Sequence, residues 1–465
     1  MEKTQNFTEG KIFSPLIRFS LPILFALFLQ AMYGAADLLI VGQFGGANAD
    51  VYVSAVSTGS QIMMTVTFVI TSIAMGLTIY VGEMIGAGKR DVAGSIIGSG
   101  IFLFGGIALI VTVLMVFCAP ALANIMHAPK EAFENTVSYV TICSWGMIFI
   151  VAYNLIGSIF RGIGDSKVPL ITVLIACILN ILGDLLLVAV FGMGASGAAI
   201  ATISAQAVSV IISLIFIRKK QLPFDFAPKM IRFDRQHTAT ILKLGIPIAL
   251  QELLVSISFL VILAIVNSLG LNPSAGVGVA EKVCAFILLI PSAFMQSMSA
   301  FVAQNMGAKR PDRAQKALWY GIITSLCVGF AIAVLAFFRG DLLAAIFAKD
   351  AQIIAPAAQY MKAYAIDCLL TPFLFCFIGY FNGCGNTTFV MLQGIIGACL
   401  VRVPVSYLMS KILPVSLFRI GLATPCSSFV QIVLCLAFYF YVKKENKLDK
   451  NKRASRLTPL DKDVI

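Results

Sequence analysis

Long apolar runs are the feature of this chain that most constrains its fold. Between residues 14 and 442 such runs follow one another, many about 20 residues or longer, which is the length a helix needs to cross a bilayer core of about 30 Å. Hydrophobic residues make up 59% of the chain and charged residues 12%, which excludes a water-soluble protein of this length. The runs are also too long, and apolar on too many faces, for a membrane β-barrel. The sequence therefore predicts an all-α integral membrane protein.

Twelve transmembrane helices are expected from these runs. The first is longer than the apolar core of a signal peptide, so we expect it to remain in the protein. The expected spans are 14–42, 53–81, 93–118, 136–159, 168–191, 197–217, 240–268, 281–305, 315–338, 357–381, 389–411 and 420–442.

The basic residues indicate how the chain is oriented. The net charge of +12 is compatible with nucleic-acid binding, but the 34 Lys and Arg residues gather in the loops of one side. With a cytoplasmic N-terminus, counting along the sequence gives 26 on the inner side, 6 on the outer side and 2 within helices, Lys362 and Arg402. The positive-inside rule then predicts a multi-pass protein of the cytoplasmic (inner) membrane with both termini in the cytoplasm and no nucleic-acid partner.

An internal repeat divides the chain into two halves. FRGIGDS (Phe160–Ser166) matches FNGCGNT (Phe381–Thr387), and GAGKRD (Gly86–Asp91) matches GAKRPD (Gly307–Asp312), both at an offset of 221 residues. Each half contains six expected spans, so both halves enter the membrane from the same side. The sequence predicts two pseudo-symmetric six-helix lobes related by an axis along the membrane normal.

Composition places the boundaries between these parts. We expect an N-terminal lobe over 1–220, a cytoplasmic linker over 221–238 that contains Pro223 and Pro228, and a C-terminal lobe over 239–442. The charged cytoplasmic tail, 443–465, lacks apolar periodicity and is expected to be disordered.

Two carboxylates within helices of the first half are the main candidates for function. An ionised carboxylate at the centre of a membrane helix costs about 2.5–3.5 kcal/mol, and the first-half helices offer Asp37 and Asp184 no Lys or Arg at mid-depth. One explanation is that each aspartate caps a helix or pairs locally. The other, which we favour, is ion coupling by Asp37, Asp184 and Asn180, which bind a proton or Na⁺.

Uncharged polar residues extend this candidate site. Gln30 and Tyr33 share a helix face with Asp37, while Asn154 and Thr202 lie in the fourth and sixth expected spans. We interpret these four residues as the lining of a substrate cavity.

The second half offers weaker candidates. Glu252 and Asp367 lie within helices, but Lys362 and Arg402 are available there to neutralise them. Glu281 is followed by Lys282, which we interpret as a pair at the membrane surface.

Pro22 and Pro247 occupy equivalent positions in the first helix of each half. A proline removes one backbone hydrogen bond and permits a kink, so these positions are candidate hinges, although a static bend is the commoner outcome.

The sequence argues against an enzyme. GMGASGAA (192–199) matches a dinucleotide-binding fingerprint but adjoins a membrane helix and lacks the acidic residue about 20 positions on that contacts the ribose. No nucleophile with a base, histidine metal cluster or ATP-binding motif is present, so neither a resident metal nor a cofactor is expected.

Taken together, the motifs resemble those of the multidrug and toxic compound extrusion (MATE) family over about residues 10–442. The resemblance rests on Leu21-Pro22 followed by Asp37, GAGKRD, RGIGDS, and FGMGASGAAIAT (191–202). It implies a V-shaped pair of lobes, alternating access, and export of organic cations or other amphipathic compounds against inward H⁺ or Na⁺.

The DinF-like branch is the most similar. The polar cluster of that branch carries over to Tyr33, Asp37, Asn180, Asp184 and Thr202, and also to Asn154. The NorM-like branch places acidic residues in the seventh and tenth helices, at a spacing that Glu252 and Asp367 do not match.

Two transport functions remain open from the sequence. The first is a monomeric antiporter that exports hydrophobic or cationic small molecules (multidrug efflux), with membrane lipids as its surroundings. The alternative is a flippase for lipid-linked oligosaccharides or lipids, which needs basic residues in its cavity.

Overall fold

The computed structural model describes residues 7–219 and 222–456, and these residues form helices and loops without a strand. Short 3-10 turns lie at Gly46–Asn48 (η1) and Pro228–Met230 (η3). The first half contains α1 Phe13–Phe44, α2 Ala49–Gly86, α3 Arg90–Ile125, α4 Phe133–Trp145, α5 Met147–Gly162, α6 Lys167–Asp184, the π-helix η2 Leu185–Val190 and α7 Gly194–Lys219. The second half contains α8 Arg235–Asn267, α9 Leu271–Ile287, α10 Leu289–Gly307, α11 Pro311–Ala345, α12 Ala351–Gly383, α13 Thr387–Ile395, the π-helix η4 Ile396–Arg402, α14 Val403–Lys411, α15 Leu417–Gly421 and α16 Ala423–Arg456.

The prediction of twelve spans is confirmed, with one of them broken. In the described residues, 11 helices are long and apolar enough to cross a membrane, and the pair α4 and α5, bent by 56°, completes twelve. The break falls at Gly146, where a Cβ atom would lie 2.4 Å from Cγ2 of Ile203 on α7. A glycine therefore lets α7 approach the chain where the fourth span bends.

The outer surface of the bundle is apolar, as expected for helices in contact with lipid. Phe117 on α3 is 81% exposed and Leu271 on α9 is 83% exposed. Large exposed apolar side chains of this kind line many other turns. The described chain is thus a multi-pass membrane protein, because water is a poor solvent for such a surface.

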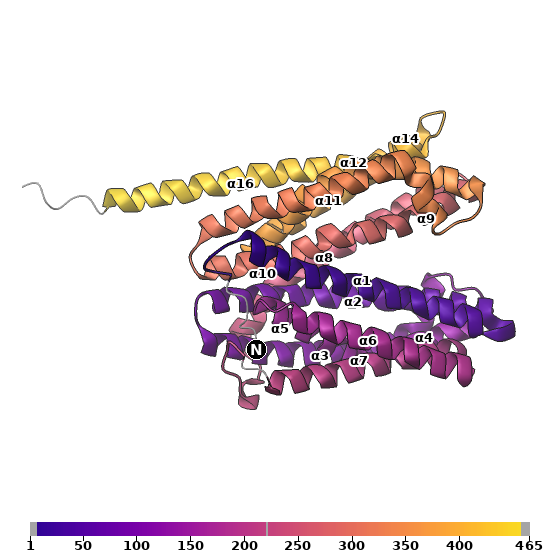
Figure 1. Cartoon of the computed structure of the whole chain (residues 1–465), viewed down its shortest axis with the longest axis horizontal. Coiled ribbons are helices and arrows are strands. Elements are labelled where there is room, and N and C mark those ends of the chain that lie inside the picture. Colours follow the sequence, from indigo (N-terminus) through magenta and orange to yellow (C-terminus); the bar gives the residue numbers. More distant parts are fainter. Residues whose placement is uncertain (1–6, 220–221, 457–465) are drawn as a thin grey trace, which may run out of the picture.

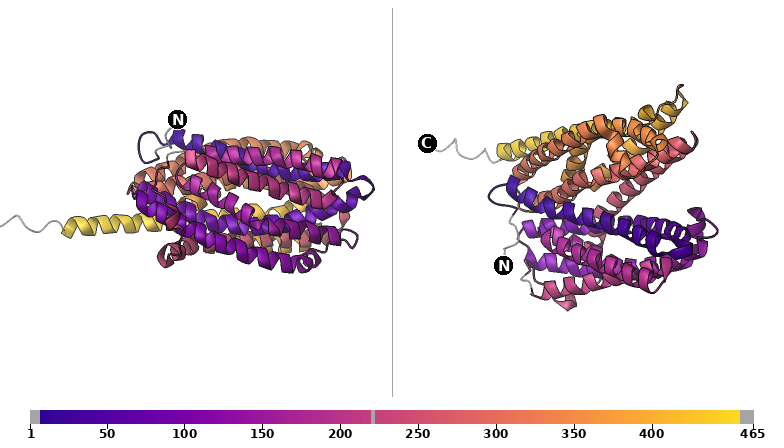
Figure 2. Two further views of the ribbon diagram at one scale, coloured as in Figure 1. Left: turned by 90° about the horizontal axis from the view of Figure 1, so that it is seen from below. Right: turned by 45° about the vertical axis from the view of Figure 1, so that its right-hand side comes forward.

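The two halves form two lobes that diverge like the arms of a V. Figure 1 shows α1–α7 in one lobe and α8–α16 in the other, and the lobes separate toward the end of the molecule remote from the N-terminus. The right-hand view of Figure 2 shows the same divergence. The V-shaped two-lobe arrangement matches the prediction.

At the closed end of the V, the lobes touch through α2, α8 and α10. A Cβ atom on Gly76 would lie 2.5 Å from the carbonyl oxygen of Ile241, and one on Gly86 would lie 1.9 Å from the carbonyl oxygen of Gln304. Real side-chain carbons do not approach this closely, so glycines permit backbone-to-backbone contact between the lobes. We call this contact the interlobe seal.

Helix α1 belongs to both lobes. Its early residues Leu16, Phe19 and Ile23 pack in the core of the second lobe, together with residues of α10, α11 and α12. Its later residues Ile40 and Val41 pack in the core of the first lobe. The helix passes from one lobe to the other just beyond Pro22.

The segment between the lobes is docked on α3. The backbone carbonyls of Asp225 and Met230 lie against Gly94 and Gly98, where Cβ atoms would lie 1.8 and 2.1 Å from them. Helix α8 begins at Arg235, inside the range predicted for the linker. Residues 220–221 lie outside the described residues.

The prediction of a disordered tail is wrong for its first part. Helix α16 continues from the membrane span to Arg456, and residues 457–465 lie outside the described residues. The segment is rich in Lys, Glu and Arg, which are good helix formers, so it extends a helix that the span has already nucleated.

Candidate functional site

Asp37 and Asp184 meet inside the first lobe. Asp37 lies on the buried face of α1, and Asp184 is the last residue of α6, directly before the π-helix η2. Their side chains are 4% and 0% exposed, and their carboxyl groups lie within hydrogen-bonding range of each other. Segments of π-helix are rare and frequently mark functional sites.

Asn180 and Thr202 complete this group, which we call the carboxyl cluster. Nδ2 of Asn180 donates to Oγ1 of Thr202 at 3.3 Å, and Oγ1 of Thr202 lies 3.4 Å from Oδ2 of Asp37. The same hydroxyl lies 3.0 Å from the carbonyl oxygen of Ala198, which is the closer acceptor for its single proton. The structure thus brings together four of the residues predicted from the sequence.

The carboxyl cluster lacks hydrogen-bond donors. Within the described part of the chain, Oδ1 of Asp37, Oδ1 of Asn180 and both carboxyl oxygens of Asp184 are buried without a donor. No basic side chain there interacts with either carboxyl group. A buried acceptor without a partner costs about 1–3 kcal/mol, so a proton shared by the carboxyls, or a small cation, would stabilise this arrangement.

Tyr33 links the carboxyl cluster to α7. Its hydroxyl interacts with the side chain of Gln206, and its ring lies near both Asp37 and Tyr153. Oε1 of Gln206 is buried without a partner.

Gln30 and Asn154 line a separate cavity. Nε2 of Gln30 lies 3.4 Å from the hydroxyl of Tyr153, while Oδ1 of Asn154 accepts a hydrogen bond from Thr71 at 3.0 Å. Their cavity lies between α1, α5, α6 and α10 and also contains Arg161. The expectation of one continuous polar pocket is therefore divided into a carboxyl cluster and this second cavity.

Several polar residues of the two sites were not singled out by their sequence pattern. Gln206 matched Gln431 in the repeat, which was a usable signal. Arg161 was counted only as a charge of the cytoplasmic side, and Tyr153 and Gln296 lack any distinguishing motif. Each becomes visible only when neighbouring helices face one another.

The two candidate hinges lie at the interface of the lobes. Pro22 is at the point where α1 changes lobes. Pro247 is two residues after Gly245, which packs against α2 so closely that a Cβ atom would lie 2.4 Å from the carbonyl oxygen of Ile73.

The second lobe holds a buried group of opposite charges around Arg402. This guanidinium is 5% exposed, donates to Oγ of Ser258 at 3.0 Å and lies 4.3 Å from the ring centre of Phe259. It interacts electrostatically with Asp367 and Glu281. Arg402 thus provides the counter-charge for the acidic groups of this lobe.

The interpretation of Glu281 as half of a surface pair is wrong. The Tyr360 hydroxyl donates to Oε1 of Glu281 at 3.1 Å, and the carboxyl faces the Arg402 group rather than the membrane surface. The helical positions of Glu281 and Lys282 differ by about 100°, which allows the two side chains to point apart. Glu252 is partly buried on α8, and no charged neighbour acts on it in the described residues.

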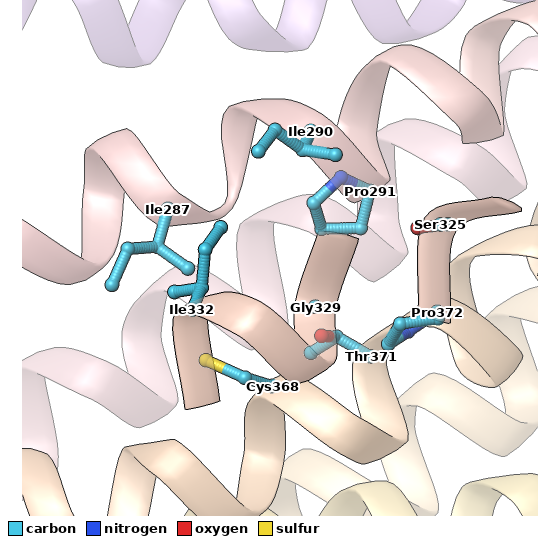
Figure 3. Close-up of a pocket in the computed structure, with 9 residues that line it drawn as sticks. All are labelled: Ile287, Ile290, Pro291, Ser325, Gly329, Ile332, Cys368, Thr371 and Pro372. Atoms are coloured by element: carbon cyan, nitrogen blue, oxygen red, sulfur yellow. The ribbon is translucent and has the colours of Figure 1, made fainter. Parts of the chain in front are cut away.

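Figure 3 shows a small pocket of the second lobe, lined by residues of α9, α10, α11 and α12 that include Ser325, Gly329 and Cys368. It has about 10 Å³ free for water-sized molecules, which is the size of one water. It is too small for an organic substrate.

Two six-helix lobes around a divided polar interior define a membrane transporter. A sequence profile of the MatE family matches residues 22–186 and 247–408, one match in each lobe. The chain therefore belongs to the MatE family, the transporter family that the sequence motifs resemble.

Named relatives and solved structures agree with this assignment. The chain is 29% identical over 446 residues to the probable multidrug resistance protein YpnP of Bacillus subtilis, covering 94% of this chain and 97% of the relative. It is 24% identical to the multidrug export protein MepA of Staphylococcus saprophyticus, covering 88% and 90%. A multidrug resistance MATE family transporter of the MOP superfamily in an outward-facing conformation superposes with a TM-score of 0.88 at 20% identity, covering 96% and 100%.

Proposed function

We propose that this protein is a secondary antiporter that exports hydrophobic and cationic small molecules by alternating access, driven by inward movement of H⁺ or Na⁺. The relatives named for multidrug resistance and multidrug export support the substrate class. Membership in a transporter family supports a carrier without enzymatic activity or a cofactor.

The observation that carries the proposal is the carboxyl cluster. Asp37 and Asp184 interact directly, are buried, and have no basic partner in the described residues. Two such carboxyls resist being charged together, so binding of an organic cation displaces a proton or Na⁺. Competition for one site is a direct way to couple two fluxes in opposite directions.

The test is efflux of ethidium from proteoliposomes under a proton gradient and a sodium gradient imposed separately. One gradient should drive efflux by the wild type, and Asp37→Asn and Asp184→Asn should reduce driven efflux to the level of protein-free liposomes. Asp50→Asn, an exposed acidic position, is the matched control and should keep the wild-type rate. Full driven efflux by Asp37→Asn would end the proposal.

The orientation belongs to the same proposal. We place both termini and the Gly86–Asp91 loop in the cytoplasm of a cell whose inner membrane holds the protein as a monomer surrounded by lipid. The excess of basic residues on that side supports this orientation. A cysteine introduced in residues 86–91, on a background without the native cysteines, should react with an impermeant reagent only after the cells are opened.

The lipid-linked flippase has less support. It requires available positive charge in the cavity, but Arg402 is occupied by Ser258, Phe259 and the acidic groups of its own lobe.

A further inference from the structure

Arg161 is a cation of the first lobe to which the proposed ion coupling assigns no role. It lies in the last turn of α5 and is partly buried, and its terminal nitrogen donates to Oγ of Ser158 at 2.9 Å. Its Nε is buried without a partner, and in the described residues the only group that acts on it electrostatically is Tyr153. A guanidinium held away from water without a counter-charge is unfavourable, so an anion from outside the chain would stabilise it.

The fold of this turn does not require the arginine. The repeat places Asn382 at the corresponding position of the second lobe. Both turns have the same backbone, since Asp165 N–H donates to Phe160 and Asn386 N–H donates to Phe381, each at 2.9 Å. The glycine that follows also has a positive φ in each turn, 83° at Gly164 and 78° at Gly385. An uncharged residue therefore serves the same turn in one lobe, and the charge in the other needs a different explanation.

The cavity beside Arg161 has the size and lining to hold an anionic group. About 40 Å³ is free for water-sized molecules, which corresponds to about three waters or one carboxylate or phosphate, and the cavity with its opening contains about 470 Å³. Gln30 and Gln296 contribute amide donors to the lining, and Ile23, Leu27 and Val173 contribute apolar surface. No acidic residue of the described chain lines it.

Gly157 keeps space for the guanidinium in this cavity. A Cβ atom at that position would lie 3.3 Å from a terminal nitrogen of Arg161, closer than an ordinary contact. The planar fork of an arginine matches a carboxylate or phosphate with two parallel hydrogen bonds.

We propose that Arg161 and this cavity form a subsite for the carboxylate or phosphate of an amphipathic molecule. The inference rests on the proposed export function and narrows its substrates, adding zwitterionic amphiphiles to simple cations. Gln30 lines the cavity and lies seven residues before Asp37 on α1, about 10 Å along the helix axis. One molecule can thus place its anionic group at Arg161 and its cationic group toward the carboxyl cluster.

The experiment compares two forms of one probe, a rhodamine dye with a free benzoate and the methyl ester of the same dye. Binding of each to the purified full-length protein is measured by fluorescence polarisation, and the readout is the ratio of the two affinities. Arg161→Gln should lower the preference for the free acid about 10- to 100-fold, the effect of losing a charge-assisted hydrogen bond. Arg161→Lys should retain part of the preference.

Two further variants control for charge and for folding. Lys243→Gln removes a positive charge from the exposed cytoplasmic end of α8 and should leave the ratio unchanged. Arg161→Asn gives the first lobe the residue of the second and is the substitute if Arg161→Gln does not fold; it should lower the ratio in the same way.

A second arm identifies the source of the anion. If the ratio stays unchanged but the wild type retains phosphatidylglycerol through purification and Arg161→Gln does not, as measured by native mass spectrometry, the subsite holds a lipid phosphate. If neither the ratio nor the retained lipid changes, the proposal is overturned. Failure of gradient-driven efflux of the ester by the wild type would reject the antiporter function alone, because the binding ratio is measured without a gradient.

Discussion

The interlobe seal gives the sharpest prediction about how the two lobes move. Gly86 of α2 lies against the carbonyl oxygen of Gln304, and Gly307 of α10 lies against the carbonyl oxygen of Glu83, with a Cβ atom 1.9 Å from the oxygen in both cases. The two contacts are related by the repeat of 221 residues. Each opposing atom belongs to the backbone and cannot rotate away as a side chain does.

The size of the effect follows from this geometry. An ordinary contact begins at about 3.4 Å, so Gly86→Ala requires the helices to separate locally by about 1.5 Å, the difference between 3.4 and 1.9 Å. Overpacking of this kind costs about 1–3 kcal/mol. Only the arrangement with a closed seal bears that cost, so the population should shift about 5- to 150-fold toward the arrangement in which the seal is open.

The assay is the distance between two spin labels, one at the open end of each lobe, measured on the purified protein without its native cysteines. Gly86→Ala and Gly307→Ala should each reduce the fraction of molecules with widely separated labels. Gly105→Ala and Gly278→Ala are matched controls, because a Cβ atom at either position meets nothing within 4 Å. A distance distribution for Gly86→Ala identical to that of the controls would refute the steric argument.

Two further predictions concern other parts of the structure. Arg402→Gln should lower the melting temperature, since it removes a hydrogen bond to Ser258 from a charged donor, worth about 1.5–3 kcal/mol, and leaves Asp367 without a counter-charge; Arg402→Gln with Asp367→Asn should recover part of the loss, and an unchanged melting temperature for the single variant would contradict the structural role. Asp234 caps α8 by accepting from the N–H of His237 at 2.9 Å, and this hydrogen bond lowers the pKa of its carboxyl below the ordinary value of about 3.9. Because the folded pKa is the lower one, the stabilisation is present above about pH 4 and is lost as the pH falls through the folded pKa. Hydrogen exchange of the His237 amide, corrected for its intrinsic pH dependence, should show loss of protection over that range in the wild type and little change in Asp234→Ala.

The spans and the two lobes could be predicted because lipid imposes length and apolarity on every crossing helix. The bend at Gly146 could not, since its cause is the approach of Ile203 from another helix. Periodicity likewise placed Gln30 on a face near that of Asp37, but neighbouring helices decide which cavity each side chain enters. Gln30 meets Tyr153, whereas Asp37 meets Asp184.

Charges were the hardest residues to interpret from sequence. Arg161 and Arg402 have the same formal charge, yet one faces a cavity and the other is enclosed by Ser258, Phe259 and acidic groups. The partners of Arg402 come from α8, α9 and α12, which lie 35 to 144 residues before it in the chain. Only the packing of those helices determines which acid each arginine neutralises.

The passage of α1 between the lobes has a consequence for the order of events during synthesis. Phe7 and Phe19 lie 5.0 Å apart between ring centres, and Phe7 lies 4.9 Å from Phe301, which leaves the ribosome 282 residues after Phe19. At about 5–20 residues per second, the start of α1 waits roughly 15–60 s for its partners. The first lobe must therefore enter the membrane with one helix half-docked, and chain termination before α10 leaves an apolar surface that has only lipid to cover it.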